Sequence, residues 1–576
     1  MTWAERFNRK VAQSAFGRWF KLEFSGASKE RKYSRFLTEV RAGLATFFAM
    51  AYIIAVNANI TAQSGGTCVC PRTAEDFACD KDVEYDLCVE VIRRDLITAT
   101  AAIAALSSFL MGVGANIPIA VAPGMGLNAY FAFQVVGYHG TGPISYQTAV
   151  TAVFVEGFIF AGLSIFGLRQ WLARAIPASI KLATGAGIGL YLALIGLTYS
   201  AGIGAITGST ATPLELAGCL PQYKDEFGVC ISHKLQNPTL WVGIFCGGIL
   251  TALLMMYRVK GAIIAGIALV SIISWPRGTE VTYFPDTPIG NDNFKFFKKV
   301  VAFHPIQKVL VAQDWNLSGA GHQFALALIT FLYVDILDCT GTLYSMARFG
   351  GFIDEHTQDF EGSAIAYTVD AMGITIGSLF GSPPVTAYIE SGAGISEGGV
   401  TGITAMVTGF CFFISIFFAP IFASIPPWAT GCTLVLVGSM MMKATADINW
   451  SYSGDGIPAF ITIICMPFTY SIAYGLIAGI ISYIVLNTTA WVIEKASGGR
   501  ITPSAKEIKD PWTWRIPGGF FPRWLVRLFQ GKAKFWEGSS IYGKGDYEMT
   551  TPASKKPNSS PPPPSETNFE PIAKQE

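Results

Sequence analysis

The sequence predicts an all-helical protein that crosses a membrane many times, and three observations support this fold class. Only 14% of the 576 residues are charged, against about 25% in soluble proteins. Apolar runs long enough to cross a bilayer recur from residue 43 to residue 495. Prolines and glycines interrupt two further expected spans, at matching places in the two halves of the chain. With a net charge of +1, nothing indicates a nucleic acid as partner.

The apolar runs and the two interrupted stretches together give about fourteen membrane segments. The uninterrupted spans are expected at about 43–60, 96–114, 148–168, 180–200, 239–257, 261–275, 322–346, 362–380, 399–420, 428–443, 457–472 and 474–495. Before them lies a basic arm, 1–42, without a cleavable signal sequence. The arm mixes aromatic and basic residues, so it either lies on the inner leaflet or forms an ordered cytosolic cap. The proline-rich tail after 497 is expected to be disordered.

Loop charges and cysteines indicate the orientation. Cations such as Arg258 and Lys443 fall in loops on the same side as the basic arm, which predicts that both termini are cytosolic. The long loop 276–321 is an exception, since its lysines fall outside. Six of the eleven cysteines fall in loops assigned to the outside: Cys68, Cys70, Cys79, Cys88, Cys219 and Cys230. An even number in an oxidising compartment predicts disulfides of unknown connectivity, and the alternative is free loop thiols.

The interrupted stretches, 116–130 and 381–395, are the candidate binding site. Each contains two prolines and at least two glycines, which break helices. Each is the third segment of its half, with seven segments before the central loop and seven after it. Paired broken segments of this kind are typical of transporters built from inverted repeats, with the substrate bound between them.

Polar residues in and beside these stretches supply the chemistry. Glu390 lies in the second stretch and Asn128 in the first. Asp335 and Asp338 lie three residues apart in the eighth segment, on one helix face. Carboxylates, an amide and free backbone groups suit a small flat heterocycle with N–H donors and ring acceptors. They suit an anion poorly, because no intramembrane Lys or Arg faces the acids.

The same acids are the candidate proton carriers. A desolvated carboxyl group can hold a proton near neutral pH, and all five histidines fall in loops or at span ends. The alternative is that one of Asp335 and Asp338 is structural and caps backbone or hydroxyl groups. Asp370 and Glu156 also lie in spans, but away from the broken stretches, so structural roles are expected for them.

Enzyme chemistry is not indicated. The sequence has no Cys/His metal spacing, no Gly-rich phosphate loop before a helix and no Ser/His/Asp cluster. No cofactor or metal is therefore expected. The aromatic residues Tyr52, Phe131, Phe331 and Tyr333 could stack on a ring, although plain packing is the more common role of such side chains.

Three segments resemble the signature motifs of the AzgA-like purine transporters, relatives of the nucleobase–ascorbate transporters. They are Ala122-Pro-Gly-Met-Gly-Leu-Asn-Ala-Tyr-Phe-Ala132, Thr330-Phe-Leu-Tyr-Val-Asp-Ile-Leu-Asp-Cys-Thr-Gly-Thr-Leu-Tyr-Ser-Met-Ala-Arg348 and Ser382-Pro-Pro-Val-Thr-Ala-Tyr-Ile-Glu-Ser-Gly-Ala-Gly-Ile395. The resemblance covers about residues 36–495. It implies proton-coupled uptake of adenine, guanine and hypoxanthine across the plasma membrane by an elevator-like movement. An anion transporter of the same architecture is the alternative.

The resemblance also implies a division into parts. The basic arm, 1–42, and the tail, 497–576, flank a core domain (43–171 and 322–420, segments one to four and eight to eleven) and a gate domain (172–321 and 421–496, segments five to seven and twelve to fourteen). Relatives are often dimers through the gate domain, so a homodimer in contact with membrane lipid is expected.

The resemblance assigns site roles as well. Asp338 takes the key acidic position of segment eight, Glu390 that of segment ten, and Asn128 the asparagine of segment three. Asp335, Gly126, Thr386 and Ser391 complete the expected substrate-binding set, and Asp338, Asp335 and Glu390 the proton-coupling set. Uric acid and xanthine transporters have Gln-Asn-Asn-Gly where this chain has Glu390-Ser-Gly-Ala. That difference puts transport of uric acid and xanthine in doubt.

Overall fold

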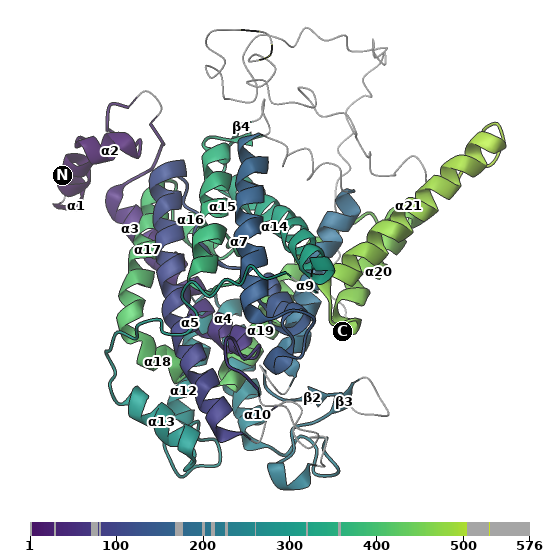
Figure 1. The fold of residues 1–576 in the computed structure, drawn as a ribbon. Coiled ribbons are helices and arrows are strands. Elements are labelled where there is room, and N and C mark those ends of the chain that lie inside the picture. Colours follow the sequence, from purple (N-terminus) through teal and green to yellow (C-terminus); the bar gives the residue numbers. More distant parts are fainter. Residues whose placement is uncertain are drawn as a thin grey trace, which may run out of the picture.

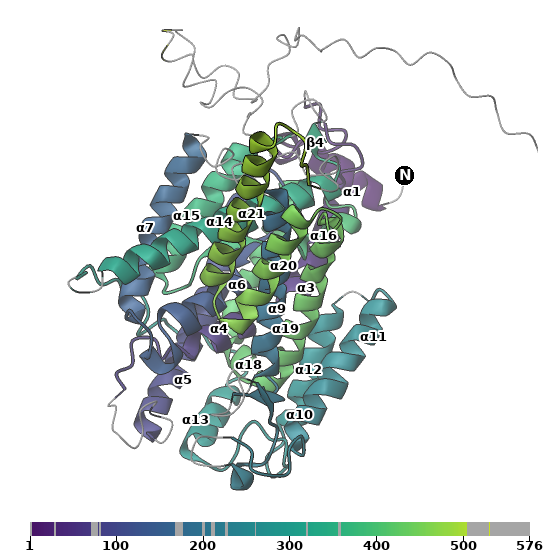
Figure 2. The ribbon, with the colours of Figure 1, turned by 90° about the vertical axis from the view of Figure 1, so that its right-hand side faces the viewer.

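The computed structural model describes residues 3–27, 30–70, 79, 82–166, 177–198, 202–208, 214–224, 229–259, 261–317, 319, 321–354, 359–503, 529 and 531. These residues form a bundle of steeply inclined helices (Figure 1). Most of the tail that was expected to be disordered lies outside the described residues. Helix α13 and strands β2 and β3 lie at one end of the bundle, and helices α1 and α2 at the other (Figures 1 and 2).

Nine spans of the described chain are long and apolar enough to cross a membrane. They are formed by α3 (Phe36–Met50) with α4 (Ile53–Ala62), α5 (Val83–Leu110), α7 (Tyr146–Ile165), α9 (Ala178–Leu197), α10 (Pro238–Val242) with α11 (Leu250–Met256), α14 (Gly321–Phe349), α17 (Gly402–Ser415) with α18 (Ala419–Ala423), α19 (Pro427–Met441) and α21 (Ile472–Ala496). Three shorter helices accompany them: α12 (Ala262–Ser274), α15 (Ser363–Leu379) and α20 (Ser453–Phe468). The prediction of a mostly helical, multi-span membrane protein is confirmed.

The remaining elements are short. They are α1 (Trp3–Ala12), α2 (Ala15–Trp19), α6 (Met125–Tyr130), α13 (Pro288–Phe297), α16 (Ser391–Ser396) and the strands β1 (Val121–Pro123), β2 (Ile206–Thr207), β3 (Glu215–Leu216), β4 (Ile353–Asp354), β5 (Asp359–Phe360) and β6 (Val385–Ala387). The strands pair in three antiparallel ribbons, β1 with β6, β2 with β3 and β4 with β5.

Two of the expected boundaries were wrong. The second span begins at Val83 rather than near 96, because the Asp82 side chain accepts the N–H groups of Glu84 and Tyr85 and caps the helix there. The first span begins at Phe36, and it is interrupted at Ala51 and Tyr52 between α3 and α4. The interruption places Tyr52 at a helix start, where its side chain is buried.

Three disulfides cross-link the connection before α5 and the loop between α9 and α10. Cys68 pairs with Cys88, Cys70 with Cys79, and Cys219 with Cys230. All six cysteines assigned from the sequence to the outside are therefore paired in disulfides, and the other five are in none. Only the structure assigns the connectivity, because pairing depends on which loops meet in space.

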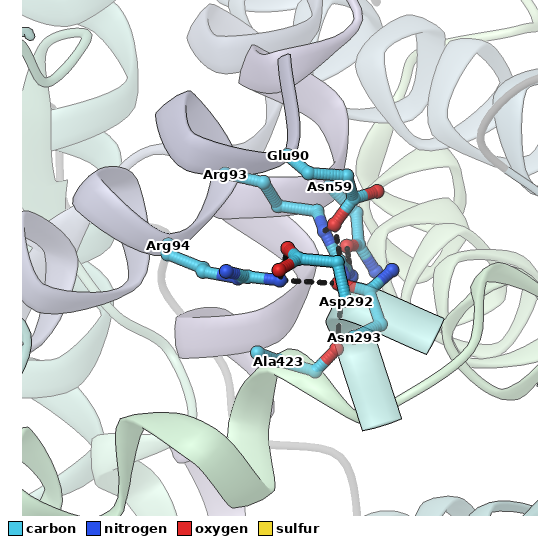
Figure 3. A network of polar contacts seen from close by, with 7 residues as sticks. All are labelled: Asn59, Glu90, Arg93, Arg94, Asp292, Asn293 and Ala423. Carbon is cyan, nitrogen blue, oxygen red and sulfur yellow. Dashed lines mark hydrogen bonds and ion pairs between the residues drawn. The ribbon is translucent and has the colours of Figure 1, made fainter. Parts of the chain in front are cut away.

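A polar network anchors the long connection between α12 and α14 to helix α5. Figure 3 shows two arginines of α5 and their partners: Asn59, Glu90, Arg93, Arg94, Asp292, Asn293 and Ala423. Arg94 donates to Asp292 and Asn293, both at 2.7 Å. Arg93 donates to Glu90 at 2.8 Å and to the Ala423 carbonyl at 3.0 Å. These contacts join α5 to α13 and to the end of α18.

Asp95, the next residue of α5, holds the same connection further along. Its fully buried carboxylate lies 2.8 Å from His304 Nε2 and accepts the backbone N–H groups of Gln307 and Lys308 at 2.9 and 2.7 Å. A buried carboxylate needs several such partners. The connection is thus attached to α5 over much of its length.

Candidate functional site

The two broken segments meet in a short antiparallel ribbon. β1 pairs with β6, with Ala122 opposite Thr386, and a short helix follows each strand, α6 after β1 and α16 after β6. Gly124 N–H donates to the Pro384 carbonyl at 2.9 Å, and Tyr388 N–H to the Ala120 carbonyl at 3.1 Å. Stretches more than 250 residues apart thus form one structural unit.

Sequence explains why these segments are not continuous helices. Prolines lack the N–H group that a helix needs, and Gly381 adopts a positive φ of 76° that favours glycine. Serine hydroxyls pair with buried backbone groups in and next to the first strand. Ser108 accepts the N–H of Val121 and donates to its carbonyl, both at 3.0 Å. Ser391 accepts the N–H of Ala120 at 3.0 Å.

Glu390 lies at the start of α16, where the second strand turns into its helix. Its side chain is 8% exposed, and its Oε1 accepts a hydrogen bond from the Tyr52 hydroxyl at 2.6 Å. The same hydroxyl lies 3.6 Å from Met125 Sδ, which belongs to α6. Tyr52 therefore joins the first span to both broken segments and orients the carboxylate.

Asp338 faces the same ribbon from helix α14. The hydroxyls of Thr386 and Thr342 lie beside its carboxylate, and the Glu390 carboxylate is near enough to interact with it. Both acids also lie close enough to Tyr388 to interact with it electrostatically. The Tyr388 hydroxyl donates a hydrogen bond to the Pro123 carbonyl. The structure thus brings together Glu390, Asp338 and Thr386, which the sequence analysis had singled out.

Asn128 is completely buried in α6. Among the described residues, neither its Oδ1 nor its Nδ2 has a hydrogen-bond partner. Leaving both ends of an amide unsatisfied is costly in a protein interior, so this side chain is suited to a ligand. Asp335 is likewise fully buried, one turn before Asp338 on α14.

Two expected site residues have scaffold contacts. The Ser391 hydroxyl holds Ala120, as described above. Gly126 lies where α6 touches helix α9, and a Cβ there would be 2.6 Å from Ile188 Cγ2. The glycine therefore permits the close approach of the two helices.

Of the aromatic candidates, Tyr52 contacts a site acid and two others pack. Phe131 and Phe331 are fully buried and stack on each other with ring centroids 6.2 Å apart. The Tyr52–Glu390 hydrogen bond was missed from the sequence, because the two residues are 338 positions apart.

The site is acidic among the described residues. Asp338 interacts with two threonine hydroxyls and the Glu390 carboxylate, and Glu390 with the Tyr52 hydroxyl and a backbone group. No Lys or Arg is among these described partners. Such a site can accept N–H donors but offers little to an anion. Glu156 and Asp370 are fully buried on the adjacent helices α7 and α15, and their carboxyl groups interact.

A bundle of membrane-spanning helices around a buried polar site is the architecture expected of a membrane transport protein. Comparison with known proteins gives the family. The Xan_ur_permease model, described as the Permease family, matches residues 83–478. The chain therefore belongs to this permease family and is a membrane permease rather than an enzyme.

Several relatives cover most of the chain. It is 65% identical to "Efflux pump notK'" of Aspergillus versicolor, over 97% of each chain. It is 64% identical to a Schizosaccharomyces pombe protein named provisionally as a xanthine/uracil permease, over 93% of this chain and 85% of that one. The guanine/hypoxanthine permease PbuO of Bacillus subtilis is 33% identical over 77% and 90%. The adenine permease AdeQ of Escherichia coli is 33% identical over 78% and 87%.

Among solved structures, the transmembrane domain of the cyanobacterial bicarbonate transporter BicA is similar, with a TM-score of 0.48 and 14% identity. The match covers 77% of this chain and 97% of the BicA domain. That likeness is too slight to bear on the substrate of this permease.

Proposed function

We propose that this permease carries purine nucleobases, namely hypoxanthine, guanine and adenine, into the cell together with protons. The observation that supports this most is the buried set of Glu390, Asp338 and Asn128 around the paired broken segments. The names of the PbuO and AdeQ relatives point to the same three bases.

The chemistry of the set matches a purine. Glu390, oriented by Tyr52, accepts one ring N–H, and Asp338 accepts another. Asn128 supplies one donor and one acceptor to the other edge of the ring. Asp335, Thr386, Ser391 and Gly126 complete the binding region through their side chains or backbone.

Proton coupling follows from the acids. Two neighbouring carboxylates in a buried site cannot both stay ionised without a large cost, so a proton taken up by Asp338, Asp335 or Glu390 would travel with the base. Binding of the base and of the proton then favour each other.

The proposed architecture has fourteen segments in two inverted repeats of seven. The count combines the nine long spans with the shorter α12, α15 and α20 and the two broken segments of the described chain, which support the proposal. The core, 43–171 and 322–420, carries the site and slides against the gate, 172–321 and 421–496. A homodimer, the plasma membrane and cytosolic termini are part of the same proposal.

The direction of transport requires a test of its own, because one relative is named an efflux pump. A coupled carrier runs along the combined gradient of its substrate and its ion, so the same site serves both directions. We propose uptake under an inward proton gradient.

The first test is uptake of labelled hypoxanthine by cells lacking their own purine carriers. Glu390→Gln should reduce uptake to background, since the amide replaces a charged acceptor. Glu280→Gln, an exposed site in the connection between α12 and α14, is the control. Normal uptake by a surface-expressed Glu390→Gln variant would disprove the site.

The second test addresses substrate and coupling. Competitors should include adenine, guanine, xanthine, uracil and inorganic anions, with uptake measured at several external pH values and with an uncoupler. Competition by the purines and sensitivity to the uncoupler are expected. Competition by anions alone would replace the proposal with the anion-transporter alternative, and indifference to pH and uncoupler would leave facilitated diffusion.

A further inference from the structure

The N-terminal helices α1 and α2 have two different faces. Their inner face is bound to the bundle: Phe7 packs edge-on against Phe36 with centroids 5.9 Å apart, and Asn8 Oδ1 accepts the N–H of Leu37 at 3.0 Å. Phe20, which follows α2, is buried in one cluster with Ile403 of α17. The helices are therefore fixed beside α3 and α17 (Figure 1).

Their outer face is aromatic and basic. We define the outer face as Trp3, Arg6, Arg9, Lys10, Arg18 and Trp19, all exposed. Trp3 is 71% exposed and Trp19 62%, although Trp19 Nε1 still donates to the Val113 carbonyl at 3.2 Å. In water, large aromatic rings at this exposure would be unfavourable. Glu5 is the only acid within α1 and α2.

The place of this face in the molecule indicates what covers it. α3 and α17 carry exposed apolar side chains, among them Phe48 and Phe410, as helices in contact with lipid do. The arm contacts the N-terminal ends of these two helices, at Phe36, Leu37 and Ile403. Headgroups are expected where a lipid-facing helix ends. Tryptophan rings and cations together are typical of a surface that lies on anionic headgroups.

We propose that the outer face of α1 and α2 binds the anionic headgroups of the leaflet on the side of the N-terminus. The proposal rests on the membrane orientation given above, but not on the transported substrate. Beyond the outer face, Arg31 donates to the Asn116 and Val400 carbonyls at 2.6 and 2.5 Å. The arm is thereby attached to the chain next to both broken segments.

The test uses the full-length protein in liposomes of phosphatidylcholine brominated in its acyl chains, with or without about one third phosphatidylserine. The signal is tryptophan quenching that is present in the wild type and absent in the Trp3→Phe/Trp19→Phe variant. Phosphatidylserine should increase this signal about twofold, and high salt should reverse the increase, because charge attraction is screened.

Neutralising the basic residues separates lipid binding from other roles. The variant Arg6→Gln/Arg9→Gln/Lys10→Gln/Arg18→Gln should lose the response to phosphatidylserine. The control, Lys295→Gln/Lys298→Gln/Lys299→Gln, changes cations at the opposite end of the bundle and should keep it. Melting curves verify that each variant is folded.

Two results would overturn the proposal. Quenching that is the same with and without phosphatidylserine would show that no anionic lipid is recognised. An absence of quenching of Trp3 and Trp19 in both lipids would assign the face to the aqueous phase, as a cap or a protein-binding surface. Neither result would affect the purine proposal, whose measurement is uptake.

Discussion

At the scale of single residues, the candidate site is organised by one hydrogen bond between distant parts of the chain. Tyr52 belongs to the first span and Glu390 to the second broken segment, and the Tyr52 hydroxyl also touches Met125. The carboxylate is thereby held in one orientation before any substrate arrives. Pre-organised acceptors of this kind reduce the ordering cost of binding.

Tyr52→Phe should therefore weaken binding without unfolding the protein. A hydrogen bond to a charged acceptor is worth about 1.5–3 kcal/mol, so KM for the purine should rise roughly 10- to 100-fold. The measurement is the concentration dependence of uptake. Tyr146→Phe is the matched control, since the Tyr146 hydroxyl donates to the Gly381 carbonyl instead; an equal rise in both variants would contradict the role of Tyr52.

Asn128 gives a second prediction at this scale, with an internal comparison. Asn128→Leu should leave the melting temperature nearly unchanged, because neither amide atom has a hydrogen-bond partner in the part of the chain that the structure describes. The same substitution should abolish high-affinity uptake. Asn57→Leu should lower the melting temperature, because Asn57 donates to Thr100 at 2.6 Å and accepts from Thr61 at 3.1 Å. A large drop in melting temperature for Asn128→Leu would instead assign Asn128 to the scaffold.

At the scale of elements, the contact between α6 and α9 deserves a direct test, because it joins a broken segment to the proposed gate. Gly126 leaves room for Ile188, and an added Cβ would come within 2.6 Å of that side chain. Overpacking of this kind costs about 1–3 kcal/mol unless the neighbour moves.

Gly126→Ala should slow transport, and adding Ile188→Ala should restore it in part by removing the clash. The readout is the initial rate of uptake at equal surface expression. Gly185→Ala is the control on α9, since its Cβ would meet nothing within 4 Å. Failure of Ile188→Ala to rescue, with normal folding of both variants, would exclude a steric cause.

At the scale of the whole molecule, the connection between α12 and α14 is attached to α5 by Asp95, His304, Arg94 and Asp292. In the proposed division this connection belongs to the gate, 172–321, whereas α5 belongs to the core. Because the connection is attached to α5, it would move with the core. The chain near the end of α12 would then have to bend as the core slides against the gate.

Asp95→Ala should lower the melting temperature by several degrees and expose the connection to protease. The substitution leaves His304 and two backbone N–H groups without their acceptor, and each buried unpaired donor costs about 1–3 kcal/mol. Asp286→Ala is the control, because Asp286 is 94% exposed and lies 3.9 Å from Arg277, where a pair contributes little. Equal protease sensitivity of the two variants would refute this attachment.

Much of this architecture can be predicted from local patterns in the sequence. The composition and the length of the apolar runs determined a helical membrane protein, because a bilayer demands long helices whose backbone groups are satisfied internally. The prolines and glycines of 116–130 and 381–395 determined that these segments break. The boundary at Val83 was missed because a polar stretch can still be helical when Asp82 caps it and tertiary contacts support it.

What the sequence by itself determined was therefore the class of fold, the place of the breaks and the candidates Glu390, Asp338 and Asn128. The tertiary structure decided which partners they have: that β1 pairs with β6, that Tyr52 orients Glu390, and which cysteines join. The physical reason is that residues hundreds of positions apart become neighbours only when the chain packs. The local periodicity of a segment does not specify which distant segment it pairs with.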